Sequence, residues 1–493
     1  MDSSSRPAML LVTGRSVGLA ASFAIGIVLA RMFDPAVFGV YKQFFLIYAT
    51  LYGVLQLGMA ESLYYFVPRK PEHTGRYAAN AIAALALTGT ASIGSLYFAR
   101  PMLAGWMNPQ LAQYALPLGL FLTFMLTATV LEIVMVSRQK HLAAAITYAI
   151  SDMVRTLLFI GPALLFASLD AVFVGAAIFA ALRLAATLVA LWRLCGRELR
   201  IDTSLLRQQL GYAVPFALAV GVDVVLINYH QYVVAARFDA ATFAIYAIGC
   251  LQIPLYDLIV TSTVNILMVK MADTPRGEAA VALWHDTVCR LAFLIFPLAA
   301  LLVVGAHDLI VGLFTATYVA SVPIFVVWVL TMLPAVMAVD AVLRVYAQTR
   351  FLLIMNLVRF ACVAGLIGAF LSSFGLMGAV LVALLGLTVT KTIGVIRVAW
   401  LMRLGVRDAL PWRRLAGITA IAVLSTVPVR WLQETVAWPP LATFIVGTTL
   451  YGATYLLLFY TGSQLRFARI KPQVTAPESQ VTNPKPQFSE PGA

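Results

Sequence analysis

The chain has 493 residues, of which 61% are hydrophobic and only 11% are charged, and its formal net charge is +13. A soluble domain carries about 25% charged residues because its surface must be hydrated, so this composition excludes an ordinary soluble protein. The four cysteines form no Cys-x2-Cys pair and support neither a zinc site nor a disulfide framework. Lipid is the remaining solvent for so apolar a chain.

Apolar runs of about 20 residues, long enough to cross about 30 Å of hydrocarbon as helices, recur along the whole chain. The first run is too long for the apolar region of a signal peptide, so we expect it to be the first membrane span. All runs are too long and too evenly apolar for barrel strands. We expect fourteen transmembrane helices, near residues 9–30, 44–67, 77–99, 114–137, 143–167, 171–194, 211–236, 246–269, 288–304, 322–343, 352–371, 376–400, 415–432 and 440–461.

The basic residues are distributed unequally over the connecting loops. With an even number of spans both termini share one side, and the loops on that side hold 19 Lys and Arg against 5 on the other (Arg31, Lys42, Arg100, Arg237 and Arg430). By the positive-inside rule, both termini are expected in the cytoplasm. The positive charge then reflects topology, and we expect no nucleic-acid partner. The segment from Gln464 to Ala493, rich in Pro, Gln, Ser and Thr, is expected to be a disordered tail.

Two short motifs occur twice at nearly the same separation. The first is an aromatic turn, Phe33-Asp34-x3-Phe38-x2-Tyr41 and Phe238-Asp239-x3-Phe243-x2-Tyr246, 205 residues apart. The second is Asp152-Met153-Val154-Arg155 and Asn356-Leu357-Val358-Arg359, 204 residues apart. Six spans separate the copies, so both enter the membrane from the same side, which indicates a parallel duplication. The aspartate of the turn either caps a short interfacial helix or contacts substrate at the outer gate.

These observations predict an all-α polytopic membrane protein built from two parallel six-helix repeats and a C-terminal helix pair. We expect the first bundle over residues 1–200 and the second over 201–405. The extra pair would occupy 406–462 and the tail 463–493.

The first repeated motif also carries a family resemblance. It reads Ala30-Arg31-Met32-Phe33-Asp34-Pro35-x2-Phe38-Gly39-Val40-Tyr41, followed by Leu57-Gly58-x2-Glu61-Ser62. This resembles the start of Wzx-type polysaccharide flippases, of the multidrug/oligosaccharidyl-lipid/polysaccharide exporter superfamily, with Phe33 in place of the usual Leu. The motifs cover about the first 70 residues, and the span number and duplication extend the resemblance to about residue 461.

The resemblance implies a multi-pass flippase of the bacterial inner membrane. It would move an undecaprenyl-pyrophosphate-linked oligosaccharide from the cytoplasmic to the periplasmic leaflet by alternating access, for exopolysaccharide, O-antigen or capsule synthesis. Its partners would be that lipid-linked oligosaccharide and membrane lipid, with a polysaccharide polymerase and chain-length proteins as further partners.

Charges within the spans are the candidates for function, because each costs about 2.5–3.5 kcal/mol on insertion. Eleven of them would be untenable against lipid, so most must pair or face a polar interior. The basic members are Arg15, Arg155, Arg183, Arg359 and Lys391. The acidic members are Glu61, Glu132, Asp152, Asp223, Asp257 and Asp340.

The basic residues are candidate ligands of a pyrophosphate. Arg15 lies on a stripe of small residues, which faces either a cavity or a closely packed helix with Arg15 reaching the interface. The family lines its lumen with cations and has a basic residue in the first span, and a guanidinium suits a pyrophosphate. Arg155 is expected to pair with Asp152, three residues away, whereas Arg359 has no local counter-ion and is the better candidate.

Two further cations complete this set. Lys391 lies near the cytoplasmic end of its span, where reaching the interface and lining the lumen are equally compatible with its position, and Arg31 is the cation of the first outer loop. Arg183 has only apolar neighbours on its helix and receives no assignment.

The acidic residues are candidates for ion coupling. Asp223 and His230 are seven residues apart on one helix face, and a buried carboxylate near mid-membrane is a natural proton or sodium site. The alternative for Asp223 is a salt bridge to an arginine of the first half. Glu61 and Asp257 are second choices. Glu132 and Asp340 are expected to pair with arginines of the cytoplasmic loops.

No enzyme motif accompanies these charges. The sequence has no phosphate-binding Gly-x4-Gly-Lys-Ser/Thr loop and no His-Glu-x2-His, so we expect no enzyme, no cofactor and no metal site.

Two other functions remain open. A cation-coupled multidrug or small-molecule antiporter of the same superfamily would need an anionic lumen, and a membrane polysaccharide polymerase would need a large outer loop with catalytic residues.

Overall fold

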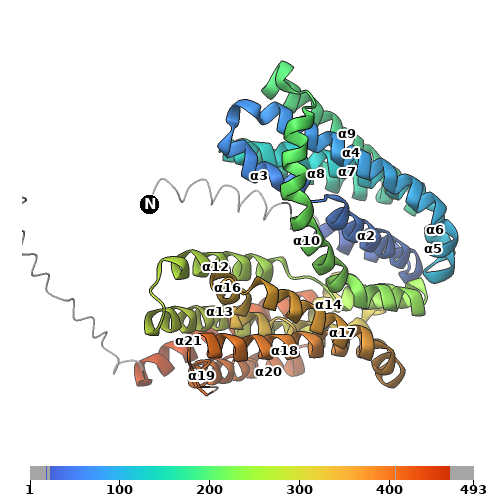
Figure 1. The fold of residues 1–493 in the computed structure, drawn as a ribbon. Helices are drawn as coiled ribbons and strands as arrows, with labels where there is room; N and C mark the ends of the chain where they lie inside the picture. Colours follow the sequence, from blue (N-terminus) through green and yellow to red (C-terminus); the bar gives the residue numbers. More distant parts are fainter. Residues whose placement is uncertain (1–17, 19–20, 22, 406, 467–493) are drawn as a thin grey trace, which may run out of the picture.

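The computed structural model describes residues 18, 21, 23–405 and 407–466, and within them it contains helices and no strands. The expected all-α fold is therefore confirmed. A helix at Phe23–Met32 is followed by helices α2 to α21, most of which are labelled in Figure 1. These are α2 (Pro35–Leu55), α3 (Met59–Arg69), α4 (Thr74–Phe98), α5 (Arg100–Trp106), α6 (Pro109–Gln113), α7 (Ala115–Ser137), α8 (His141–Phe166), α9 (Leu169–Cys195), α10 (Thr203–Arg237), α11 (Ala240–Gly249), α12 (Pro254–Asp273), α13 (Glu278–Val304), α14 (Ala306–Phe314), α15 (Ser321–Leu330), α16 (Val339–Val345), α17 (Thr349–Phe374), α18 (Leu376–Leu401), α19 (Trp412–Leu424), α20 (Val427–Thr435) and α21 (Pro440–Arg466).

Twelve of the described helices or helix pairs are long and apolar enough to cross a membrane, and α10, bent by 43°, makes a thirteenth. Each lies on one of the spans expected from the sequence. The remaining expected span, 9–30, falls largely outside the described residues. The chain is a multi-pass membrane protein.

The helices form two lobes (Figure 1). We call α2–α9 the N-lobe and α11–α21 the C-lobe. Helix α10 runs from one to the other: it packs against α3 and α4 in the N-lobe and against α17 and α18 in the C-lobe. Pro215 lies inside α10 and removes a backbone donor where the helix bends, which explains the bend locally.

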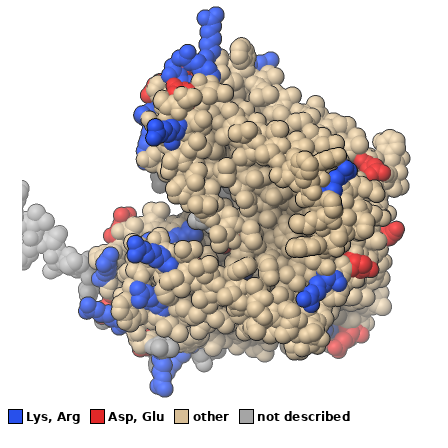
Figure 2. Space-filling model, turned by 45° about the vertical axis from the view of Figure 1, so that its right-hand side comes forward, with Lys and Arg blue, Asp and Glu red and all other residues tan. Residues whose placement is uncertain are grey.

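Lysines and arginines gather at one end of both lobes, and a notch between the lobes opens at that end (Figure 2). We call this the basic end. It holds the loops after α3, α7, α9, α12, α16 and α18, which are the loops assigned to the cytoplasm by charge. Acidic residues are seen mainly at the opposite end (Figure 2).

At the opposite end the lobes are in tight contact through α2 and α11. A Cβ atom added to Gly39 would lie 1.8 Å from the carbonyl oxygen of Ala240, so only glycine permits this approach of the two backbones. The rings of Phe38 and Tyr318 meet edge to face with centroids 6.1 Å apart. One apolar core includes residues of both lobes here. The molecule is thus closed at this end and open at the basic end.

The helix boundaries show how far the repeated motifs correspond. Asp34 and Asp239 are the N-cap residues of α2 and α11, so the aromatic turns occupy equivalent places. Helices α8 and α17 begin 208 residues apart (349 minus 141), whereas Arg155 and Arg359 are 204 apart. Arg359 therefore lies about one helical turn nearer the basic end than Arg155 does.

Two boundary expectations were wrong. Lys42 lies inside α2, in the span itself, and not in an outer loop. Helix α21 continues to Arg466, three residues into the segment for which we expected disorder. The rest of that segment is outside the described part of the chain.

Candidate functional site

Four charged residues of the N-lobe spans, on α7, α8 and α9, form one cluster. Arg183 Nη2 lies 2.5 Å from Glu132 Oε1, and the two side chains are only 17% and 7% exposed. Arg155 Nη2 lies 2.7 Å from Asp152 Oδ1, which confirms the expected pair. The expectation that Glu132 pairs with a loop arginine is wrong: its partner is the previously unassigned Arg183, on a neighbouring helix. With two acids and two bases, the described residues of the N-lobe cluster are electrically balanced.

The N-lobe cluster also borders the polar side of α2 and the segment before Phe23. The side chains of Tyr48 and Tyr52, one turn apart on α2, lie within electrostatic range of Arg183. A Cβ atom added to Gly18 would lie 1.7 Å from Asp152 Oδ2, so the carboxylate packs directly onto that glycine. Arg15 itself lies outside the described residues.

The charges of the C-lobe spans form a second cluster, contributed by α10, α16, α17 and α18. Lys391 Nζ lies 2.5 Å from Asp340 Oδ2, so Asp340 pairs with an intramembrane lysine. The expectation that Asp340 pairs with a loop arginine is therefore wrong. Arg359 is influenced by the charges of Asp223 and Asp340 but forms no ion pair within 4 Å among the described residues.

The C-lobe cluster is not balanced. It comprises three bases and two acids: Arg344, Arg359, Lys391, Asp223 and Asp340. Arg359 lies on the same stripe of α17 as the buried Met355, Val363 and Ile367. Its stem packs beside Gly386 of α18, where an added Cβ would be 3.6 Å from Arg359 Cγ. The guanidinium therefore starts from the protein-facing side of α17 and not from the lipid-facing side.

The two ion pairs are themselves a repeat. Glu132 and Arg183 are 51 residues apart, and so are Asp340 and Lys391. Each member of the second pair lies 208 residues after its counterpart, the offset that also relates the start of α17 to that of α8. Sequence reasoning missed this correspondence, although the shared spacing of 51 was the available signal.

The candidate coupling residues do not come together. His230 is buried in the C-lobe, with Nδ1 2.6 Å from the Tyr246 hydroxyl and its ring packed against Trp328. Asp223 is half-buried on the same helix and forms no hydrogen bond with His230. Glu61 Oε2 is buried and has no hydrogen-bond partner in the described structure. Asp257 is exposed.

Arg31 is placed far from both clusters, at the end where the lobes meet. Its Nε donates to the carbonyl of Leu313 at 2.7 Å, and its Nη2 donates to the carbonyl of Gly312. These carbonyls end α14, where the helix dipole favours a cation. Arg31 thus ties the segment before α2 to the C-lobe.

Among the described residues, no three His, Cys, Asp or Glu side chains are grouped so that they could hold a metal ion.

Comparisons with known proteins identify the family and the fold of the chain. The family described as polysaccharide biosynthesis protein matches residues 28–323. Among solved structures, the lipid II flippase MurJ in an inward closed conformation aligns with a TM-score of 0.70 at 13% identity, covering 93% of this chain and 98% of that one. No curated protein sequence matches the chain.

Two other transporters share the fold at lower similarity. An inward-facing multidrug resistance transporter of the MATE family gives a TM-score of 0.55 at 13% identity, over 78% of this chain and 96% of that one. A MOP superfamily transporter from Pyrococcus furiosus, described by the reverse polarity of its binding pocket, gives 0.56 at 14% identity, over 81% and 95%. The chain therefore belongs to the polysaccharide biosynthesis protein family and has the polytopic fold of MOP-superfamily flippases and transporters.

Proposed function

We propose that this protein is a flippase for a polyprenyl-pyrophosphate-linked oligosaccharide. It would act in the bacterial cytoplasmic membrane with both termini in the cytoplasm, and the basic end would face the cytoplasm. It would work as a transporter and not as an enzyme, accepting the lipid-linked sugar at the notch and releasing it at the opposite end.

The observation that carries the proposal is the uncompensated cation of the C-lobe. Arg359 faces the protein interior and forms no ion pair with any described residue, while Arg155, Arg183 and Lys391 are each held by a carboxylate. A guanidinium offers two parallel donors, which match a phosphate group in geometry and charge. A pyrophosphate would supply the counter-charge that Arg359 lacks. Arg15 remains a second candidate ligand.

The contacts of the other charged residues suit them to supporting roles. Arg155 and Lys391, already paired, would set the local potential, and Arg31 would stabilise the contact of the lobes at the closed end. Asp223, half-buried and without an ion pair in the described structure, is the candidate to carry a coupling proton or sodium ion, with Glu61 second.

Alternating access would then require the lobes to part at the outer end and to meet at the basic end. The contacts that have to break are those of Gly39 with Ala240, Phe38 with Tyr318, and Arg31 with α14. Helix α10, which packs on both lobes and bends near Pro215, is the connection across which they would rock.

The proposal is tested by genetic complementation and lipid analysis. A strain lacking the gene should accumulate a pyrophosphate-linked oligosaccharide in the cytoplasmic leaflet, and the wild-type gene should clear it. Arg359→Ala should fail to clear it, whereas Arg155→Lys, which keeps the pair with Asp152, should succeed. A deletion strain with a normal lipid-linked pool would contradict the proposed substrate.

A further inference from the structure

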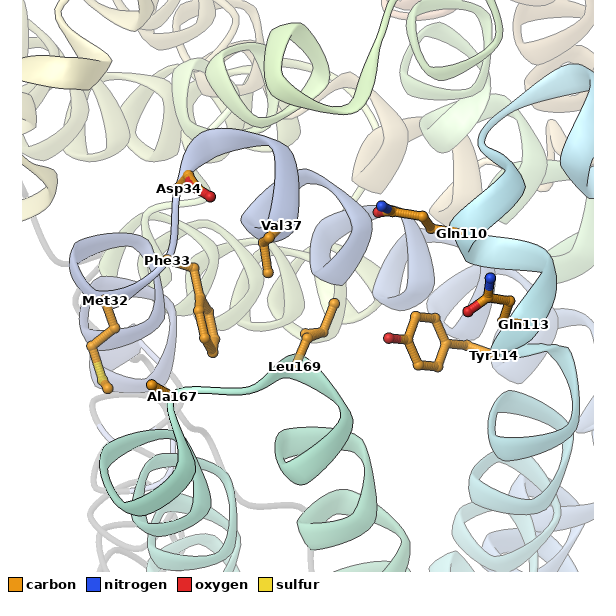
Figure 3. Close-up of a pocket in the computed structure, with 9 residues that line it drawn as sticks. All are labelled: Met32, Phe33, Asp34, Val37, Gln110, Gln113, Tyr114, Ala167 and Leu169. Atoms are coloured by element: carbon orange, nitrogen blue, oxygen red, sulfur yellow. The ribbon is translucent and has the colours of Figure 1, made fainter.

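The outer end of the N-lobe contains a pocket of about 480 Å³ that belongs to neither charge cluster. It is bounded by the segment before α2, by α2 itself, by α6 with the turn into α7, and by the loop between α8 and α9. Figure 3 shows Gln110 and Gln113 at one end of it and Met32 at the other. Its lining residues are Met32, Phe33, Asp34, Val37, Gln110, Gln113, Tyr114, Ala167 and Leu169.

The lining of this pocket suits a neutral, hydroxyl-rich ligand. Two amides offer both donors and acceptors, and one carboxylate offers acceptors, while no lysine or arginine is present to hold a phosphate. Tyr114 and Phe33 add aromatic surface to pack against the C–H face of a ring. The volume lies within the range of about 300–1,000 Å³ typical of small-molecule sites.

The aromatic wall is held in place by neighbouring side chains. The Tyr114 hydroxyl donates to Asp170 Oδ1 at 2.7 Å, and its ring lies 4.5 Å from that of Phe173, centroid to centroid. Phe33 is buried. These contacts fix the walls, so a ligand would meet a surface that is largely preformed.

The internal repeat supplies a control for Asp34. Its counterpart Asp239 caps α11, with Oδ1 accepting from the Thr242 backbone N–H at 2.9 Å. Asp34 makes no such cap on α2, and its carboxylate has no hydrogen bond or ion pair with any described residue. At equivalent places, therefore, one aspartate stabilises a helix and the other lines a pocket with its acceptors unused.

We propose that this pocket binds an uncharged sugar ring of the oligosaccharide on the outer side of the membrane. The ligand assignment rests on the proposed function; the pocket's preference for a neutral polyol rests on its own lining. The pocket lies directly beside Arg31 and the closed contact between the lobes, so a sugar held there would sit at the point where the lipid-linked substrate leaves. Binding would favour release toward the outside.

The test uses the full-length protein in lipid nanodiscs and the water-soluble oligosaccharide released from its lipid by mild acid. Calorimetric titration should show saturable binding to the wild type. Asp34→Ala and the double variant Gln110→Ala/Gln113→Ala should weaken it at least tenfold. The matched control Asp239→Ala, and Arg359→Ala in the pyrophosphate site, should bind as the wild type does.

Folding and transport are measured in parallel. Each variant is checked by thermal unfolding, and Gln110→Trp, which fills the pocket from its exposed rim, should abolish binding if the alanine variants are unstable. Wild-type affinity in Asp34→Ala and Gln110→Trp would overturn the pocket. Transport of the lipid-linked substrate without binding of the free oligosaccharide would also overturn it. Binding without transport would retain a sugar site and remove the flippase.

Discussion

The two halves of the molecule carry related charges but use them differently. In the described part of the N-lobe, Arg155 is paired with Asp152 and Arg183 with Glu132. In the C-lobe, only Lys391 is paired, and Arg359 is left without an ion pair among the described residues. One ion pair thus lies at equivalent places in the two halves, whereas Arg359 has Asn356, and not an acid, three residues before it. We infer that the N-lobe pairs serve structure and the unpaired C-lobe arginine serves substrate.

At the closed end, opposite the basic end, the division is reversed. There the second half uses Asp239 as a helix cap, and in the first half Asp34 lines a pocket without a hydrogen bond to any described residue. Equivalent positions in the two halves of a duplicated fold can therefore have different roles. What decides the task is whether a local partner, such as the Thr242 backbone N–H, is in reach.

The largest effect on stability is expected at the two equivalent ion pairs, of which Glu132–Arg183 is more buried than Asp340–Lys391. Glu132→Ala should lower the free energy of unfolding by about 3–5 kcal/mol, because it leaves Arg183 as an uncompensated buried charge. Asp340→Ala should cost less, about 1–2 kcal/mol, because the Asp340 side chain is 46% exposed and Lys391, although only 14% exposed, still lies within electrostatic range of Asp223. Chemical unfolding in detergent measures both.

The double variant Glu132→Gln/Arg183→Gln is the control for the buried pair, and it should lose less than the two single variants together. Equal losses at Glu132 and Asp340 would contradict the difference that we assign to the two halves.

A smaller effect is expected at the contact between the lobes. Gly39→Ala should destabilise this outward-closed form by about 1–3 kcal/mol, because the added methyl would overlap the Ala240 carbonyl. Gly26→Ala, where an added Cβ meets nothing within 4 Å, is the matched control and should be neutral or slightly stabilising. Labelling of a cysteine placed at Tyr318, from the outside of intact cells, should rise in Gly39→Ala only. Unchanged labelling would exclude α2 and α11 as the outer gate.

The smallest effect separates the two N-cap aspartates. Hydrogen bonds from Thr242 lower the pKa of Asp239 below its ordinary value of 3.8. The charged cap therefore adds stability above about pH 4, and this contribution is lost as the pH falls through the lowered pKa. Asp239→Ala should cost about 1 kcal/mol at neutral pH, and Asp34→Ala close to nothing. Unfolding temperatures measured from pH 7 to pH 3 should converge for Asp239→Ala and wild type, and a constant gap would exclude the cap.

The fold could be predicted from sequence because hydrophobic length and loop charge act locally. The same holds for the Asp152–Arg155 pair, whose members are three residues apart on one helix. The pair of Glu132 and Arg183 could not be predicted, since its members lie on different helices whose packing decides which faces meet. Lys42 was wrongly expected in a loop because the start of α2 cannot be read from the sequence where the residues at the membrane interface are also apolar.

The candidate site was predicted less completely for a related reason. Arg31 was grouped with the lumen cations, but it contacts carbonyls nearly 300 positions away, a tertiary contact that has no sequence signature. The pocket at the closed end combines residues from three separate segments, of which only the Phe33-Asp34 turn was noticed in the sequence. Charges alone identified Arg359, because its counter-ion is missing from the same helix.

The most direct test is transport of a fluorescent polyprenyl-pyrophosphate oligosaccharide by purified protein in liposomes. Losing a charge-assisted contact worth about 1.5–3 kcal/mol should slow Arg359→Ala roughly ten- to a hundredfold. Arg155→Lys, folded to the same extent by thermal unfolding, should transport at a rate near that of the wild type. If Arg359→Ala moves the labelled lipid as fast as the wild type does, the unpaired arginine of the C-lobe is not the pyrophosphate ligand.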